Sequence, residues 1–145
     1  MHRAKLAVLL PAVAGPLILL PGPAAAGTPA DQQKRFGEEL RVAEFPFGGF
    51  SAQRGEAFFN ATHGSEWSCS SCHTNNPRAA GKHARTAKPI PPLAPAANPG
   101  RFTDSATVDK WFRRNCNDVL DRACTVQEKG DILAYLMQLS YGGQR

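Results

Sequence analysis

The chain has 145 residues, enough for one small domain, with 17 basic and 12 acidic side chains and a formal net charge of +5. This mild excess excludes the dense basic face that nucleic-acid-binding proteins carry. It would suit docking to an acidic protein partner.

Residues 1–26 have the order of a secretory signal peptide. Two basic residues come first, an apolar run covers residues 6–20, and three alanines end the segment at Ala26. A membrane anchor is the alternative, but two prolines interrupt the run and it falls short of the ~20 apolar residues of a span. We therefore expect cleavage after Ala26, export to the periplasm, and one domain over residues 27–145.

Two helices are predicted at the start of that domain. The first runs to about Ala43, since Thr28 is a candidate N-cap and a proline follows it in the first turn. The second covers residues 52–61, with Ser51 as its N-cap. Gly55 inside it costs ~1 kcal/mol in helix propensity. It marks either a close helix crossing or a tolerated glycine on a solvent-facing side.

Residues 67–73 read Trp-Ser-Cys-Ser-Ser-Cys-His and contain Cys-x-x-Cys-His, the pattern of covalent c-type haem attachment. Cys69 and Cys72 would each form a thioether with one vinyl group, and His73 would be the proximal iron ligand. A redox dithiol or half of a zinc site are the alternatives. Zinc would require a second ligand pair of this spacing, which the two remaining cysteines do not provide. Together with the export signal, the motif favours one covalently bound haem c.

The segment from Thr74 to Thr103 has no helical or strand periodicity and contains six prolines, which prevent a long helix or a central strand. A loop of this length suits a segment that wraps a ligand. Four basic side chains of this segment could pair with the haem propionates, namely Lys82, Arg85, Lys88 and Arg101. Basic side chains on a loop are more commonly solvated, without such a partner.

Two further helices complete the prediction. One begins near Asp104 and reaches about Asn115, with Trp111 on its apolar side, packed either against the porphyrin or in the protein core. The last begins with a Thr125–Glu128 capping box and continues to Ser140. The fold class is therefore all-α, a class I cytochrome c-like helical domain wrapped around the haem.

The residues alone leave the second axial ligand open. Many small cytochromes use a methionine here, but Met1 leaves with the signal peptide and Met137 lies on the last helix, where methionine usually fills the core. His63 and His83 could each form a bis-histidine site, or be exposed histidines without a ligand role.

A longer pattern resembles the sphaeroides haem protein family of monohaem cytochromes c. It extends over most of residues 27–145, and its Asn-Cys-Asn element followed by a second cysteine is more specific than the haem motif. The matching stretches are Gly81-Lys82, Pro89 to Pro95, Arg101 to Ser105, Lys110-Trp111, Arg114 to Asn117, Arg122, Cys124-Thr125 and Glu128-Lys129.

The resemblance implies a distal ligand and a disulfide. In the family, the asparagine before the first non-haem cysteine binds ferric iron, and Asn115 occupies that position. The resemblance also pairs Cys116 with Cys124, a bridge that an oxidising compartment permits. Without the family, Asn115 would be interpreted as a helix C-cap.

The implied function is electron transfer with a ligand site that opens on reduction, because an amide oxygen is a weak donor that suits ferric better than ferrous iron. Oxygen or nitric oxide would then bind and could be reduced. The implied electron donor is a dihaem cytochrome c or a membrane cytochrome. A simple six-coordinate electron carrier and a sensor or scavenger of diatomic gases are the alternatives.

Overall fold

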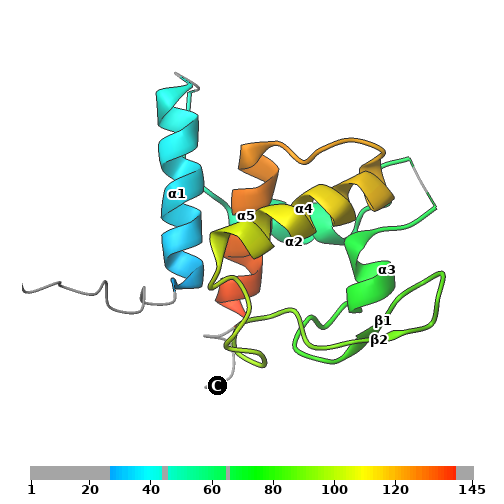
Figure 1. The fold of residues 1–145 in the computed structure, drawn as a ribbon. Helices are drawn as coiled ribbons and strands as arrows, with labels where there is room; N and C mark the ends of the chain where they lie inside the picture. Colours follow the sequence, from blue (N-terminus) through cyan, green and yellow to red (C-terminus); the bar gives the residue numbers. More distant parts are fainter. Residues whose placement is uncertain (1–26, 44–45, 65, 140–145) are drawn as a thin grey trace, which may run out of the picture.

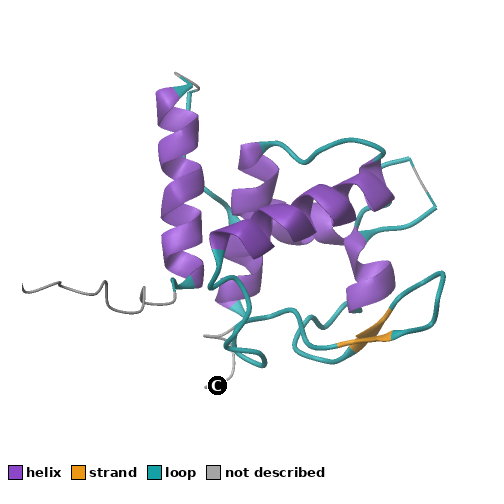
Figure 2. Cartoon of the chain, in the orientation of Figure 1, coloured by secondary structure: helices purple, strands orange, loops and turns teal. Residues whose placement is uncertain are grey.

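The structure is a computed structural model that describes residues 27–43, 46–64 and 66–139. The predicted signal peptide lies outside these residues. Helices dominate the described part (Figures 1 and 2), as expected for an all-α domain. The elements are α1 (Pro29–Val42), α2 (Ala52–Asn60), α3 (Cys69–His73), β1 (Gly81–Lys82), β2 (Pro89–Ile90), α4 (Ser105–Leu120) and α5 (Val126–Gln138). Nowhere in these ranges is a helix both long and apolar enough to cross a membrane.

Side-chain caps start the helices where the sequence predicts. In α1, Thr28 Oγ1 accepts from the Asp31 N–H at 3.2 Å, and the Asp31 carboxylate accepts from the Thr28 N–H at 2.8 Å. Thr125 and Glu128 form the same capping box at the start of α5. These reciprocal bonds satisfy N–H groups that a helix leaves without partners, so both beginnings are confirmed.

The core forms where α1 and α2 pack against α5, and α4 adds Val108, Phe112 and Cys116 to it. Its largest fully buried side chains include Phe36, Phe59, Leu133 and Leu136, one from α1, one from α2 and two from α5. A Cβ built on Gly55 would overlap the backbone carbonyl of Asp131. Of the two interpretations of Gly55, the close helix crossing is therefore confirmed, and the solvent-facing glycine is wrong.

A buried carboxylate fastens this crossing. Asp131 accepts from the Ser51 N–H at 2.7 Å, from Arg54 Nε at 2.7 Å and from Gln127 Nε2 at 3.0 Å. Its side chain is only 7% exposed, and these donors compensate for the loss of water around the charge. The N-terminus of α2 is thereby held on α5.

Helix α4 is longer than predicted, which corrects the interpretation of Asn115 as a C-cap. The helix continues to Leu120 and ends at Asp121, whose φ of 55° and ψ of 26° are left-handed, a conformation that aspartate tolerates. The buried face continues through Cys116 and Val119, and this helical spacing sustains the last turns. Asn115 therefore lies inside the helix.

The proline-rich segment is more ordered than a structureless loop. Gly81 pairs with Ile90 and Lys82 with Pro89 in a short antiparallel hairpin, where Pro89 occupies an edge position. The buried Pro77 accepts from two backbone N–H groups, those of Leu93 and Ala94, each at 2.9 Å. The prolines thus prevent long helices and strands in this segment. The Pro77 carbonyl nevertheless holds the segment in place by accepting backbone hydrogen bonds.

Candidate functional site

The haem motif forms a single helical turn, α3. Ser68, 5% exposed, caps it: Ser68 Oγ accepts from the Ser71 N–H at 3.2 Å, and Ser71 Oγ accepts from the Ser68 N–H at 3.0 Å. Residues three apart share a helix face, so the turn brings Cys69 and Cys72 together, with His73 following directly. Neither thiol is in a disulfide.

The β1–β2 hairpin lies against this turn. The Ala84 N–H donates to Cys72 Sγ at 3.2 Å. A Cβ on Gly81 would overlap the Cys72 carbonyl, so β1 approaches α3 more closely than any larger residue would permit. This contact could not be predicted from the sequence, because no periodic signal marks strands of two residues.

Burial sets the protonation of the motif residues. It lowers the pKa of His73 to about 4, and the charge of Arg101 adds to the effect. The imidazole is therefore neutral at physiological pH, the form that binds a metal. Burial also raises the pKa of the Cys69 thiol to about 11, with a smaller contribution from Cys72. The ring of Phe59 lies 6.4 Å from that of His73, centroid to centroid, and connects the motif to the core.

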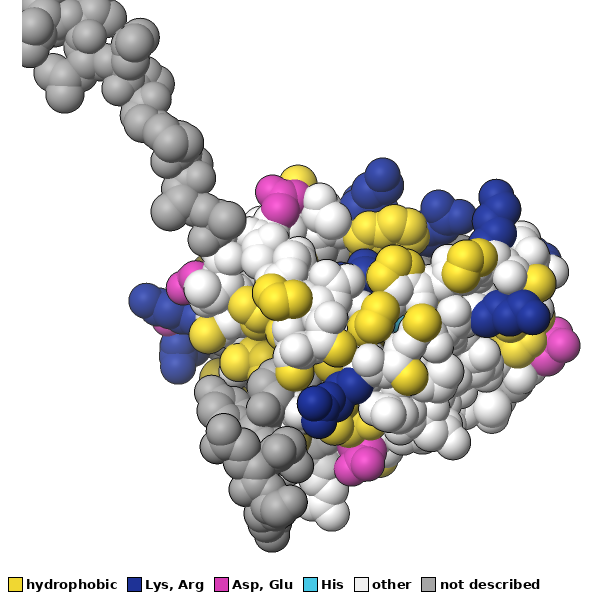
Figure 3. Space-filling view, turned by 90° about the horizontal axis from the view of Figure 1, so that it is seen from below, with side chains coloured by type: hydrophobic (Ala, Val, Ile, Leu, Met, Phe, Trp, Pro, Cys, Tyr) yellow, Lys and Arg dark blue, Asp and Glu magenta, His cyan; other side chains and the backbone are white. Residues whose placement is uncertain are grey.

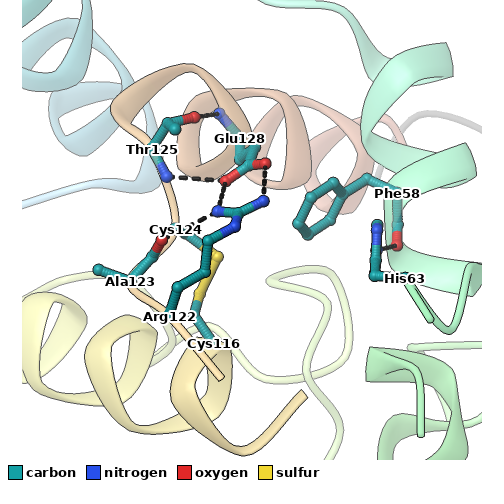
Figure 4. Close-up of a disulfide and its surroundings, with 8 residues drawn as sticks. All are labelled: Phe58, His63, Cys116, Arg122, Ala123, Cys124, Thr125 and Glu128. Carbon is teal, nitrogen blue, oxygen red and sulfur yellow. Dashed lines mark hydrogen bonds and ion pairs between the residues drawn. A yellow bond between two sulfur atoms is a disulfide. The ribbon is translucent and has the colours of Figure 1, made fainter. Parts of the chain in front are cut away.

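Asn115 lies half-buried in α4 beside a disulfide. Cys116 and Cys124 are bonded to each other and both are buried, each 6% exposed. The bridge ties the last turns of α4 to the segment before α5 (Figure 4). Cys116 belongs to the core against which Cys69 packs. The structure thus contains the disulfide that the sequence resemblance implied.

An ion pair fixes the segment that carries Cys124. Arg122 Nη1 and Nη2 donate to the Glu128 carboxylate at 2.8 and 2.7 Å, and Nη1 also donates to the Ala123 carbonyl at 2.9 Å. Figure 4 shows Glu128 between Arg122 and Thr125, beside the bridge. Burial alone would raise the pKa of Glu128, but the bonds from Arg122 and Thr125 lower it overall.

The structure gives the three other candidate iron ligands different surroundings. His63 is exposed, and its Nε2 donates to the Phe58 carbonyl at 2.8 Å (Figure 4). His83 Nδ1 accepts from two N–H groups of the hairpin turn, each at 3.3 Å. Met137 lines an open groove of about 600 Å³ between α1 and α5. The two histidines thus have local structural roles, and Met137 also packs against the core, as predicted for a methionine on the last helix.

The four cations considered for propionate binding separate into two groups. Arg101 is half-buried, and it donates to the Pro92 and Pro91 carbonyls at 3.3 Å each. Lys82, Arg85 and Lys88 are exposed on the hairpin. The sequence does not distinguish Arg101 from the other three, because its effect on the pKa of His73 depends on the fold of the segment between them.

Trp111 does not lie in the core. It is 41% exposed, one helical turn before Asn115, and basic side chains flank it, with Lys110 Nζ 6.0 Å and Arg114 Cζ 5.6 Å from its ring centroid. The core interpretation is therefore wrong, while contact with a porphyrin stays a prediction. The donor set fits a c-type haem, since it has two unbridged thiols one turn apart and an adjacent neutral imidazole.

Comparison with known proteins identifies relatives. Residues 46–136 match the family described as a domain of unknown function, DUF1924. The cytochrome c-type protein SHP of Cereibacter sphaeroides is 46% identical over 122 residues, which cover 81% of this chain and 91% of the relative.

Two solved structures of related cytochromes are also similar to this chain in sequence and fold. Oxidised SHP, described as an oxygen-binding cytochrome c, superposes with a TM-score of 0.66 and 43% identity over 77% of this chain and 97% of its own. The solution structure of Methylophilus methylotrophus cytochrome c'', a study of haem-ligand detachment, gives a TM-score of 0.67 and 37% identity over 77% and 94% of the two chains. The chain therefore belongs to the DUF1924 family and to the family of SHP, with an all-α cytochrome c fold and haem c as its cofactor.

Proposed function

We propose that the chain is an exported monohaem cytochrome c that transfers electrons and whose distal ligand, Asn115, leaves on reduction to admit a diatomic molecule. The observation that carries the proposal is the position of Asn115, half-buried in α4 and directly before the disulfide-bonded Cys116. A weak ligand needs a rigid backbone to hold it near a metal.

The proximal side is assigned to α3. Cys69 and Cys72 would hold the haem through thioethers, and His73, already neutral, would bind iron without first losing a proton. When bound, the haem would supply one-electron chemistry between ferric and ferrous iron. Trp111, on the same helix as Asn115, would cover part of the porphyrin.

The distal side is assigned to Asn115. Its amide oxygen is a hard, neutral donor, which favours ferric over ferrous iron. Reduction would therefore release it, and its N–H₂ group could then donate a hydrogen bond to the incoming diatomic ligand. Two relatives support this proposal, since one is described as binding oxygen and the other in terms of haem-ligand detachment.

The proposed location is the periplasm. The signal-peptide pattern of residues 1–26 and the Cys116–Cys124 disulfide both suit an oxidising compartment. There the chain would accept electrons from a dihaem cytochrome c or a membrane cytochrome. Oxygen or nitric oxide would be the molecule that it binds and could reduce.

Replacing Asn115 tests the proposal. In Asn115→Ala, we expect the ferric holoprotein to change from a low-spin to a high-spin optical spectrum, because the sixth ligand is lost. Asn117→Ala is the matched control, an exposed asparagine on the same helix and on the other side of Cys116, and its spectrum should not change. A low-spin spectrum in Asn115→Ala would indicate a six-coordinate carrier that uses His63, His83 or Met137.

A further inference from the structure

Charge is distributed unevenly along the chain. Residues 67–103 contain five basic residues and no aspartate or glutamate. The other ten basic residues of 27–145 share the remaining sequence with all 12 acidic ones. With histidines neutral, the segment that carries the haem motif has a charge of +5, and the rest of residues 27–145 has a charge of −2.

Within the described ranges, no ion pair neutralises these cations. The four ion pairs among the described residues use Arg35, Arg41, Arg54 and Arg122, all outside the segment. Arg78, Lys82, Arg85 and Lys88 are exposed, and Arg101 is half-buried. Figure 3, which views the molecule from below the orientation of Figure 1, shows separate Lys and Arg side chains around apolar groups. Such an arrangement produces a positive potential in solvent.

One cation of the segment is held in place beside the motif. The Arg85 guanidinium carbon lies 5.0 Å from the centroid of the Trp67 ring, a cation–π contact that restricts a long side chain. The neighbouring Ala84 N–H donates to Cys72 Sγ, so the backbone next to Arg85 lies against the thiol expected to carry the haem. Arginine and tryptophan are also the residues that most often dominate protein–protein binding energy.

We infer that the hairpin from Gly81 to Ile90, together with Trp67, is the docking surface for an acidic one-electron redox protein. Positive charge around the haem attachment would attract a negatively charged partner and orient it toward the haem edge. One electron would leave the partner's reduced centre and convert ferric to ferrous iron. From the proposed function, the inference uses only the attachment of the haem at α3. It does not depend on Asn115 as the distal ligand.

Electron-transfer kinetics test this surface. The probe is reduced flavodoxin, an acidic one-electron donor protein, mixed with the ferric holoprotein. We expect the second-order rate constant to fall by roughly 10-fold or more between about 10 mM and about 300 mM salt. At low salt, Lys82→Glu/Lys88→Glu should slow the reaction by a further factor of roughly 10.

The matched control reverses two charges elsewhere. Lys34→Glu/Arg41→Glu makes the same change in net charge on α1, at the opposite side of the molecule from the hairpin in Figure 1. It should slow the reaction by less than roughly threefold. An unchanged ferric spectrum in both variants checks the fold and the distal ligand separately from docking.

Several results would overturn the inference. Equal slowing in the two double variants would show an effect of net charge alone. A wild-type rate that salt does not change would show that charge does not guide the encounter. If the hairpin variant reacted normally but no longer bound vesicles of anionic phospholipid, the surface would serve a membrane instead of a protein.

Discussion

Gly55 has little space around it, because the backbone of Asp131 lies where a side chain would begin. That backbone belongs to α5 and is held by the bonds of the Asp131 carboxylate to Ser51 and Arg54. A larger residue could be accommodated only if two packed helices moved apart, since closely packed cores transmit strain.

We therefore predict that Gly55→Ala lowers the free energy of unfolding by about 3 kcal/mol, despite the better helix propensity of alanine. Urea unfolding of the holoprotein, followed by circular dichroism, measures the change. Gly48→Ala is the control, because a Cβ at Gly48 meets nothing within 4 Å. Equal stability of Gly55→Ala and wild type would show that the helices do not cross this closely.

Individual residues of the site were predictable where the chemistry is local. Cys69, Cys72 and His73 form one short motif, which the sequence displays directly. The approach of Arg101 to His73 joins residues far apart in the chain. Such a contact depends on how the intervening segment folds, and no periodicity predicts it.

The segment between α4 and α5 is held by the disulfide and by the Arg122–Glu128 pair. The bridge restrains Cys116, and the ion pair restrains the backbone around Cys124. Helix α4 therefore has a fixed end close to Asn115, which suits a position from which a weak ligand would act.

We predict that Glu128→Gln lowers the free energy of unfolding at pH 7 by about 1 kcal/mol. The pKa of Glu128 in the folded protein lies below its ordinary value of 4.5. The carboxylate therefore contributes fully above pH 4.5, and its contribution is lost as the pH falls through the folded-state pKa. Urea unfolding at pH 7 and at about pH 3 should show the difference between variant and wild type shrinking in acid.

Glu38→Gln provides the comparison. Glu38 pairs with Arg41 at 2.8 Å, but both side chains are more than half exposed, 56% and 59%. Exposed pairs contribute little, so this variant should match wild type at pH 7. If Glu128→Gln also matched wild type at both pH values, the pair would not stabilise the segment.

Among the elements, prediction succeeded where side-chain caps mark the ends. The capping boxes of α1 and α5 place their first turns correctly. The end of α4 was missed because Asp121, its C-cap, adopts the left-handed conformation that glycine more commonly supplies. The β1–β2 hairpin was missed because two-residue strands show no alternation of polar and apolar side chains.

At the scale of the whole molecule, the helical core and the cofactor-binding segment have different roles. Helices α1, α2, α4 and α5 provide most of the buried interior. Residues 67–103 carry the haem motif and, within residues 27–145, all of the net positive charge. A partner guided by charge would therefore meet the haem edge, while α4 would provide the distal ligand from within the domain.

The most direct measurement is the optical spectrum of the mature holoprotein, ferric, then reduced with dithionite under argon, then exposed to carbon monoxide. Our proposal predicts a low-spin ferric spectrum, a high-spin ferrous spectrum and a shift with carbon monoxide, because Asn115 leaves the reduced iron. A sharp low-spin ferrous spectrum that carbon monoxide does not change would contradict it, since a strong sixth ligand would then persist through the redox cycle.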